Sequence, residues 1–249
     1  MKRHPFQGLW NIIRFNRHFY LFVLVISVLL LLFWKQLPAP VQKLLVPGMA
    51  VAMGAMLLSL LVSWYVYDVS DLYRLKWLKQ ANGLRLLNIN AGFDETSDII
   101  QRRFPQADLA VCDFYDPSRH TEISMKRARE AYPPHPMAVS VETGRLPFPD
   151  NSFDASLVTL AAHEIRKEKE RIQFFKELRR ITKPAGQIMV TEHLRDWPNF
   201  LAYTIGFFHF HSRRTWLKDF KQAGLIVREE IKTTPFISTF ILEKHGNTD

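Results

Sequence analysis

The stretch RLPFPDNSFD, residues 145–154, indicates a proline-stiffened turn that leads into a buried strand. Pro147 and Pro149 fix their own φ angles and favour extended backbone in the residues before them. Residues 150–152, DNS, are typical of turns. The apolar run from residue 153 to residue 160 is typical of a strand that is covered on both faces. Because this pattern also fits an ordinary turn before any buried strand, the flanking segments decide the fold.

Strand-like and helix-like segments alternate from residue 84 to residue 242. We expect strands at 84–89, 109–112, 137–141, 153–160, 186–191, 225–231 and 236–242, and helices at 95–104, 118–131, 167–181 and 213–223. Such alternation predicts a doubly wound α/β fold with a mostly parallel sheet. Since no helix separates the last two strands, they must form an antiparallel hairpin.

Two apolar segments precede this domain. Residues 19–34 and 44–67 contain no charged side chain, and about 20 helical residues cross the hydrocarbon core of a bilayer. The second segment is long enough, whereas the first needs Leu37 or snorkelling side chains. We therefore predict a transmembrane helical hairpin. A signal peptide is the alternative for the first segment, but the basic leader is long and no small-x-small cleavage site follows.

Basic residues set the expected orientation. They lie before the first span and after the second, whereas the connecting loop has only Lys35 and Lys43. This asymmetry predicts that both termini and the α/β domain lie on the cytoplasmic side. Residues 1–85 hold ten Lys or Arg and two Asp or Glu, and the rest holds 23 against 22. The net charge of +9 therefore fits anionic headgroups and does not support nucleic-acid binding.

We expect four parts along the chain: a cytoplasmic segment (1–18), the transmembrane hairpin (19–67), a juxtamembrane helix (68–83) and the α/β domain (84–249). The third part carries Leu72, Leu75 and Leu78 at helical spacing, which is typical of an amphipathic helix. Cys112 is the only cysteine, which excludes an intramolecular disulfide and a multi-thiolate metal site and fits a reducing cytosol.

The first two strand ends of the domain carry candidate ligand-binding residues. Ligands bind such sheets beyond the carboxyl ends of the strands. Gly92 follows the first strand between Asn90 and Asp94, two residue types that tolerate a left-handed φ. Asp113 closes the second strand 21 residues later, and an acid at about that spacing bonds ribose hydroxyls in nucleotide-binding sheets. Each feature alone also has a structural interpretation: the loop at Gly92 fits a plain strand-to-helix turn, and Asp113 fits a solvated loop acid.

Two later strand ends carry ionisable side chains. His163 and Glu164 follow the strand at 153–160, and Glu192 and His193 follow the strand at 186–191. Each pair offers a candidate general base, worth about 10² to 10⁴ in rate. The alternatives are that Glu164 only begins the next helix and that the second pair belongs to a surface salt-bridge cluster.

An aromatic segment, residues 197–211, lies before the last helix. It is too short and too interrupted to span a bilayer. It is either a lid over an apolar substrate or a core helix. His209 and His211 lie two residues apart without a third ligand in sequence, so no metal site is expected.

Residues 145–154 resemble the loop and fourth strand of class I S-adenosylmethionine-dependent methyltransferases, closest to the ubiquinone and menaquinone type (methyltransferase type 11). Residues 179–186, RRITKPAG, resemble this family's turn into strand five. The resemblance covers roughly residues 84–244. It implies a Rossmann-like seven-stranded methyltransferase sheet, and the terminal hairpin separates this fold from dinucleotide-binding domains. It also implies S-adenosylmethionine as the cofactor.

The resemblance assigns roles to residues at the strand ends. It implies cofactor contacts at the ends of the first three strands, from Asn88, Asn90, Gly92, Asp113, Phe114, Glu142 and Thr143. Only Gly92 remains of the three glycines in the family's acid-x-Gly-x-Gly-x-Gly loop, and Asn88 replaces the acid. Catalytic roles fall on His163, Glu164, Glu192 and His193, where the family lines its methyl-transfer channel.

The predicted function is a membrane-anchored methyltransferase that acts on a small hydrophobic acceptor, such as a quinone precursor or a lipid. Holding donor and acceptor in line is worth up to about 7 to 11 kcal/mol, so few catalytic side chains are needed. A catalytically inactive, methyltransferase-like scaffold or regulator of the membrane is the alternative, which the missing glycines favour. A nicotinamide dehydrogenase is disfavoured by the terminal hairpin and the same missing glycines.

Overall fold

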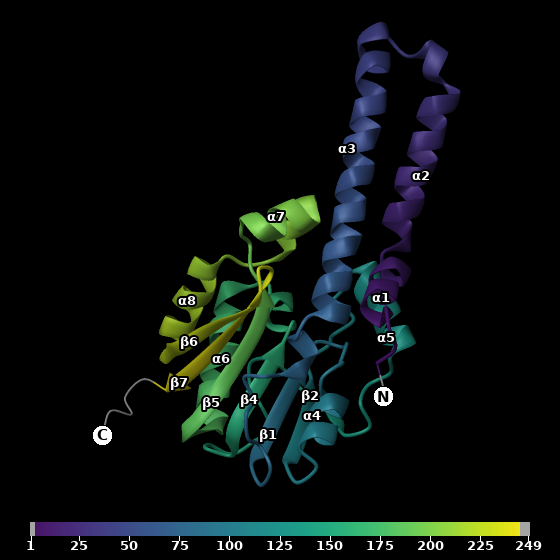
Figure 1. Ribbon diagram of the computed structural model, residues 1–249. Helices are drawn as coiled ribbons and strands as arrows, with labels where there is room; N and C mark the ends of the chain where they lie inside the picture. Colours follow the sequence, from purple (N-terminus) through teal and green to yellow (C-terminus); the bar gives the residue numbers. More distant parts are fainter. Residues whose placement is uncertain (1–2, 245–249) are drawn as a thin grey trace.

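The computed structural model describes residues 3–244 and shows an α/β domain from which a helical hairpin projects (Figure 1). The strands are β1 (Arg85–Asn90), β2 (Asp108–Asp113), β3 (Ala138–Ser140), β4 (Phe153–Thr159), β5 (Thr182–His193), β6 (Leu225–Thr234) and β7 (Ile237–Lys244). They form one sheet in the order β3-β2-β1-β4-β5-β7-β6. β7 runs antiparallel to β5 and β6, and the remaining pairs are parallel. The predicted mostly parallel sheet with a terminal antiparallel hairpin is confirmed.

Helices cover both faces of this sheet. In the domain they are α4 (Ser97–Arg103), α5 (Ile123–Ala131), α6 (Glu168–Ile181), α7 (Trp197–Tyr203) and α8 (Arg213–Gln222), with short 3-10 helices at Ala162–Glu164 and Thr204–His209. Leu87 and Ile89 of β1 pack in one apolar cluster with α6 and α8, whereas Leu86 packs in a second cluster with α4. The alternation of neighbouring side chains along β1 thus joins the sheet to both layers.

The helix expected over 118–131 begins five residues late, at Ile123. A side chain explains the difference, because Asp116 Oδ1 accepts the backbone N–H of Ser118 at 2.8 Å and holds these residues in a turn. The strand expected at 186–191 is longer than predicted, since β5 begins at Thr182 and pairs there with Phe153.

The juxtamembrane helix predicted over 68–83 is wrong beyond its first turns. The structure has a π-helical turn that ends at Val69 and a 3-10 turn at Leu72–Arg74, after which Leu75 takes a left-handed φ of 45° and no helix follows up to residue 83. The apolar pattern still has a structural role, because Leu72, Leu75 and Leu78 are all buried. Leu75 and Leu78 pack in the cluster under α4. Burial against the sheet, rather than helical periodicity, sets the path of this segment.

The hairpin consists of α1 (Gln7–Phe15), α2 (Arg17–Leu32), α3 (Ala39–Trp64) and a π-helical turn at Tyr65–Val69. Between residues 3 and 244, one helix, Ala39–Arg74, is long and apolar enough to cross a membrane. The pair α1 and α2 also meets this test if it counts as one span, although it is bent by 62°. Only 6% of the apolar window of the long helix is buried inside the protein, so this helix does not form part of the domain core.

Helix α1 joins the hairpin to the domain. The Asp68 carboxylate accepts the backbone N–H groups of Gly8 and Leu9 at 2.7 and 2.8 Å, which satisfies free donors at the start of this helix. At the other end, Arg127 of α5 donates to the carbonyl oxygen of Phe15 at 2.7 Å. The base of α3 and the domain therefore hold α1 between them.

A buried ion pair joins α6 to α8, and it should carry much of their stability. Arg171 Nε lies 2.6 Å from Asp219 Oδ2, with side chains 2% and 0% exposed. Asp219→Ala leaves the guanidinium buried without a counter-charge, so we expect the free energy of unfolding to fall by about 3 to 5 kcal/mol. Urea unfolding of the full-length protein in mild detergent measures this change.

A matched control comes from an exposed pair between the same helices. Lys218 Nζ lies 2.7 Å from Glu168 Oε1, and both side chains are about half exposed. Lys218→Ala should cost less than about 1 kcal/mol. Equal losses in the two variants would show that burial does not set the strength of the Arg171 pair.

Candidate active site

The carboxyl ends of β1 and β5 lie at the edge of the sheet that faces the base of the hairpin (Figure 1). Two contacts between distant residues place them there. Tyr67, just after α3, bonds His193 at the end of β5, and Arg3 forms an ion pair with Glu95 in the loop after β1. Because parallel strands end at a common edge, the predicted site residues lie along this edge of the sheet.

The loop after β1 is shaped by side-chain hydrogen bonds. Asn90 Oδ1 accepts the N–H of Gly92 at 3.0 Å, and Asp94 Oδ1 accepts the N–H groups of Thr96 and Ser97 at 2.9 Å each. Asn90 and Asp94 tolerate a left-handed φ but do not adopt one here, because in residues 88–96 only Gly92 has a positive φ, of 97°. Polar side chains close the turn where the resemblance places glycines.

Asn88, which replaces the acid of that loop, is buried and bonds to the start of α4. Its Nδ2 donates to Thr96 Oγ1 at 2.9 Å and to Ser97 Oγ at 2.8 Å. Its Oδ1 is buried and has no hydrogen-bond partner in the part of the chain that the structure describes. An unpaired buried acceptor is costly, so a group with an N–H or O–H that reached this oxygen would be stabilised there.

Asp113, at the end of β2, is buried and fully engaged. Its Oδ1 accepts the N–H of Tyr115 at 2.9 Å, and its Oδ2 pairs with Arg129 of α5. The Tyr115 side chain lies against Gly92 so closely that a Cβ on this glycine would stand 2.8 Å from the ring. Asp113, Tyr115, Arg129 and Gly92 therefore form one packed group.

A cleft of about 840 Å³ opens between the loops that follow β2, β3 and β4. Its lining includes Phe114, Glu142, Thr143 and Glu164 of the predicted residues. This volume lies within the usual range for small-molecule sites. The other predicted residues do not line the cleft: Asn88, Asn90, Gly92, Asp113, His163, Glu192 and His193.

The loop at 145–150 is held by α6. Arg180 donates to the carbonyl oxygens of Phe148 and Leu146 at 2.8 and 3.0 Å, and Glu177 accepts the N–H of Leu146 at 2.9 Å. These bonds fix the loop that runs on from Glu142 and Thr143. The stretch that predicted the fold therefore supports one wall of the cleft.

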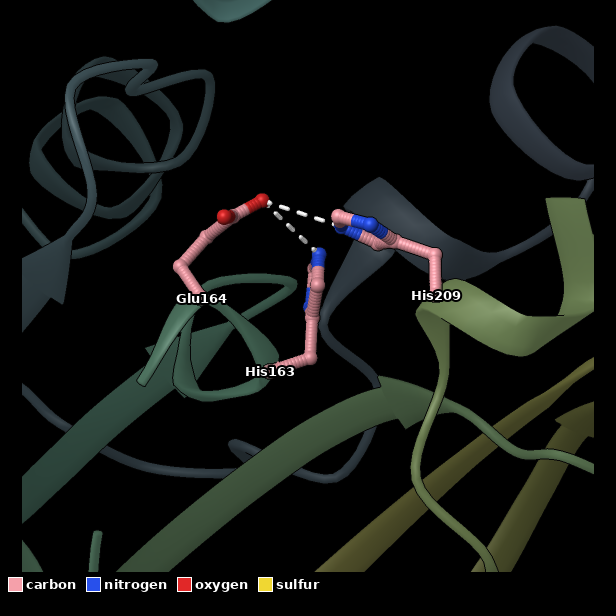
Figure 2. Close-up of side chains that lie close together, drawn as sticks. All are labelled: His163, Glu164 and His209. Carbon is pink, nitrogen blue, oxygen red and sulfur yellow. Dashed lines mark hydrogen bonds and ion pairs between the residues drawn. The ribbon is translucent and has the colours of Figure 1, made fainter. Parts of the chain in front are cut away.

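His163, Glu164 and Glu192 form a hydrogen-bonded chain. Glu192 is fully buried and accepts from the backbone N–H of His163 at 3.2 Å and from its Nδ1 at 2.7 Å. His163 Nε2 lies 3.3 Å from Glu164 Oε1 (Figure 2). Burial lowers the pKa of His163, but the two carboxylates outweigh it and raise this pKa to about 10. Burial also acts on Glu164, raising its pKa, yet bonds from His163 and His209 outweigh it and lower this pKa.

His193 lies in a different environment. Its Nδ1 is 3.0 Å from Asn199 Oδ1, an acceptor, so this nitrogen carries the hydrogen. Its Nε2 then accepts from the Tyr67 hydroxyl at 2.9 Å, and its ring stacks on Phe210. Burial lowers the pKa of His193 to about 4. His193 is therefore neutral near pH 7, unlike His163.

Sequence reasoning missed three residues of this site. Tyr67 lies 126 positions from His193. His209 approaches Glu164 within 3.3 Å, and Glu122, just before α5, lies 3.3 Å from the other ring nitrogen of His209. His209 and His211, which lie two residues apart, do not belong to the same cluster, because His211 Nε2 lies 3.2 Å from Arg171 Nη1. The spacing of these residues in the sequence does not predict their contacts, because crossover connections bring distant segments together.

Comparison with known proteins shows that the domain is similar to methyltransferases. Residues 89–190 match the family model described as a methyltransferase domain. The ubiquinone/menaquinone biosynthesis C-methyltransferase UbiE of Cereibacter sphaeroides is 27% identical over 121 residues, covering 47% of this chain and 45% of that protein. The UbiE protein of Paracoccus denitrificans is 28% identical over 133 residues, covering 53% and 51%. The chain thus spans about half the length of the curated relatives it matches.

Solved structures share the fold. A SAM dependent methyltransferase from Aquifex aeolicus matches with a TM-score of 0.51 at 15% identity, covering 72% of this chain and 92% of that one. The PH0226 protein from Pyrococcus horikoshii OT3 matches with a TM-score of 0.52 at 15% identity, covering 69% and 85%. The solved structures show that the domain has the class I methyltransferase fold, and the family match over residues 89–190 supports S-adenosylmethionine as the cofactor. This confirms the predicted fold of the domain and its predicted cofactor.

The neutral, buried His193 should make the protein sensitive to acid. An unfolded histidine has a pKa of about 6.5, so between about pH 6.5 and pH 4 the unfolded chain binds a proton that the folded chain does not. The stabilising contribution is present above this window and is lost as the pH falls through it. We expect the melting temperature of His193→Gln to fall less than that of the wild type between about pH 7 and pH 5.

His4, exposed near the N-terminus, provides the control. His4→Gln should melt with the pH dependence of the wild type. The interpretation of His193 fails if His193→Gln loses as much thermal stability in acid as the wild type does.

Proposed function

We propose that this protein is a membrane-anchored S-adenosylmethionine-dependent methyltransferase that acts on a small hydrophobic acceptor, such as a quinone precursor or a lipid, on the cytoplasmic side. One observation carries the proposal. The strand ends of the methyltransferase domain, with their buried His and Glu side chains, meet the base of the one helix between residues 3 and 244 that is apolar enough to cross a membrane. The names of the UbiE relatives, which refer to quinone biosynthesis, support the acceptor class.

The residues at the strand ends fit the cofactor. Gly92, with its φ of 97° and no side chain, would let the backbone approach the donor closely once the Tyr115 ring moves away, and Asn88 Oδ1 offers a buried acceptor. Asp113 would hold the ribose hydroxyls, with Phe114 and Glu142 at the adenine in the cleft. The cofactor supplies a methyl group on a sulfonium, and these residues orient it. Since the ring of Tyr115 covers Gly92 and Arg129 holds Asp113, we expect both side chains to move when the donor binds.

The aromatic segment supports a hydrophobic acceptor. Helix α7 and the 3-10 helix after it expose large apolar side chains, namely Trp197 (72% exposed), Leu201 (60%), Ile205 (79%) and Phe208 (65%). Ala202 and Tyr203 of the same segment pack with Val62 near the end of α3. Helix α7 lies beside the lower part of α3 (Figure 1). An exposed apolar surface beside a membrane span suits the bilayer interface. An acceptor dissolved in the bilayer would then enter the site beneath α7, near His193.

Within the site, few side chains are needed for chemistry. In-line displacement depends on alignment, which a buried, hydrogen-bonded frame supplies. Glu164 lines the cleft and is the candidate base, although its lowered pKa makes it a weak one. His163 and Glu192 hold Glu164 in place, and His193 with Tyr67 closes the floor beside them.

The inactive scaffold remains a second candidate because of one observation. The side chains of Tyr115 and Arg129 occupy the approaches to Gly92 and Asp113, where the donor would bind. If these side chains are immobile, the donor site stays closed. Donor binding therefore decides between the two functions.

Calorimetric titration of the detergent-solubilised, full-length protein with S-adenosylmethionine tests the proposal. We expect saturable binding, and no binding at millimolar ligand would favour the scaffold. Asp113→Ala removes charged hydrogen bonds worth about 1.5 to 3 kcal/mol, so the affinity should fall about 10- to 100-fold. Asp108→Ala, at the exposed start of the same strand, should bind as the wild type does. An equal loss in both variants would contradict the assigned role of Asp113.

Contact of α7 with the bilayer is tested by fluorescence quenching in proteoliposomes that contain brominated lipids. The chain has six tryptophans, so the signal of Trp197 is the difference between the wild type and Trp197→Phe. We expect this difference signal to be strongly quenched. Trp77, buried in the domain core, gives the matched control through Trp77→Phe, and its difference signal should be quenched weakly. Equal quenching of both would place α7 away from the interface.

A further inference from the structure

We propose that His163, Glu164 and His209 form a site for one divalent transition-metal ion, with Zn²⁺ as the best match, in the wall of the cleft. Binding of the metal goes beyond methyl transfer and does not depend on it. The three residues come from the turn after β4 and the 3-10 helix after α7, and their side chains point toward one another (Figure 2).

The distances between the ligand atoms suit such an ion. One ligand atom from each residue lies within 4.8 Å of the other two. Glu164 Oε1 is 3.3 Å from His163 Nε2 and 3.3 Å from His209 Nε2. Ligands bound at about 2.0 to 2.1 Å in tetrahedral geometry lie about 3.3 Å apart. The site therefore needs little rearrangement to hold the ion.

The surrounding carboxylates orient both histidines for metal binding. His163 Nδ1 bonds Glu192 Oε2 at 2.7 Å, and His209 Nδ1 lies 3.3 Å from Glu122 Oε1. In each ring one nitrogen thus faces an outer carboxylate, while Nε2 faces Glu164. This carboxylate–histidine–metal arrangement is the usual support of a metal-binding histidine, because it fixes the tautomer and raises the basicity of the ligand nitrogen.

The formal charge of the cluster also favours a cation. The cluster holds three carboxylates, those of Glu122, Glu164 and Glu192, and one guanidinium, that of Arg166, which pairs with Glu122. The metal must displace the proton that the carboxylates hold on His163. Once both imidazoles are neutral, a divalent ion offsets the two remaining negative charges.

Arg166 lies 3.6 Å from Glu122, and its guanidinium contacts both ring nitrogens of His209, Nδ1 more closely than Nε2 at 3.0 Å. It must therefore move away before His209 can bind the ion. Its side chain is 42% exposed and has room to turn toward solvent.

Three protein ligands leave a tetrahedral ion with one open position, which is the pattern of catalytic rather than structural sites. Of the three ligands, Glu164 lines the cleft of about 840 Å³, so we place the open position on the side of the cleft, where it would face a small molecule bound there. Its natural ligand is an anionic or phenolic oxygen. If the proposed function holds, this oxygen belongs to the acceptor, and that role alone rests on the proposed function.

Metal titration of the full-length, chelator-treated protein in detergent tests the site. We expect one Zn²⁺ per chain by calorimetry, and Co²⁺ in its place should give the strong visible absorption of a tetrahedral site. His209→Asn and Glu164→Gln should each lower the affinity at least about 100-fold. Glu192→Gln, which touches no metal, should lower it about 10- to 100-fold through His163. His209 is partly exposed, so its variant tests the site without disturbing the core.

His211→Asn is the matched control, since His211 lies two residues from His209 but faces Arg171. It should bind the metal as the wild type does. Substoichiometric binding by the wild type, or equal losses in His209→Asn and His211→Asn, would overturn the proposal. These titrations contain no methyl donor. A failure here alongside donor binding that depends on Asp113 would remove the metal site and leave the proposed function standing.

Discussion

The parallel pairing of β1, β2, β4 and β5 is the constraint on which the site depends. Because these strands run the same way, each delivers its last side chain to one edge of the sheet. The base of the hairpin meets that same edge, with Tyr67 against His193 and Arg3 against Glu95. Any chemistry at the strand ends therefore takes place beside the long apolar helix.

Burial at this edge makes partners obligatory for polar groups. Glu192 is fully buried at the end of β5, and its carboxylate is satisfied by the backbone and ring of His163. His193, one residue on, is satisfied by Asn199 and Tyr67 without any charge. Two histidines that lie near one another thus have pKa values of about 10 and about 4. The carboxylates of Glu164 and Glu192 raise the pKa of His163, whereas burial lowers the pKa of His193.

Local interactions explain which expectations from the sequence succeeded. Strand positions were predicted to within a few residues, because apolar runs bounded by turn residues identify buried strands whatever surrounds them. The helix over 68–83 failed because the leucines that suggested it found cover against the sheet in an irregular segment. At Asn90, which tolerates a left-handed φ, the amide closes the turn through a hydrogen bond and Gly92 takes the positive φ instead. In both segments a tertiary or side-chain contact sets the path of the backbone.

By itself the sequence determined the succession of strands and helices along the chain and the long apolar helix. It also offered Asp113, Glu142, His163 and Glu192 as candidate site residues, since each lies at a recognisable strand end. Only the tertiary structure decided which candidates meet. It joined His209 to Glu164 across 45 positions, and it left His211 elsewhere although it is two residues from His209. The physical reason is that periodicity and turn chemistry act over a few residues, whereas a site is assembled by crossovers whose contacts have no signature in sequence.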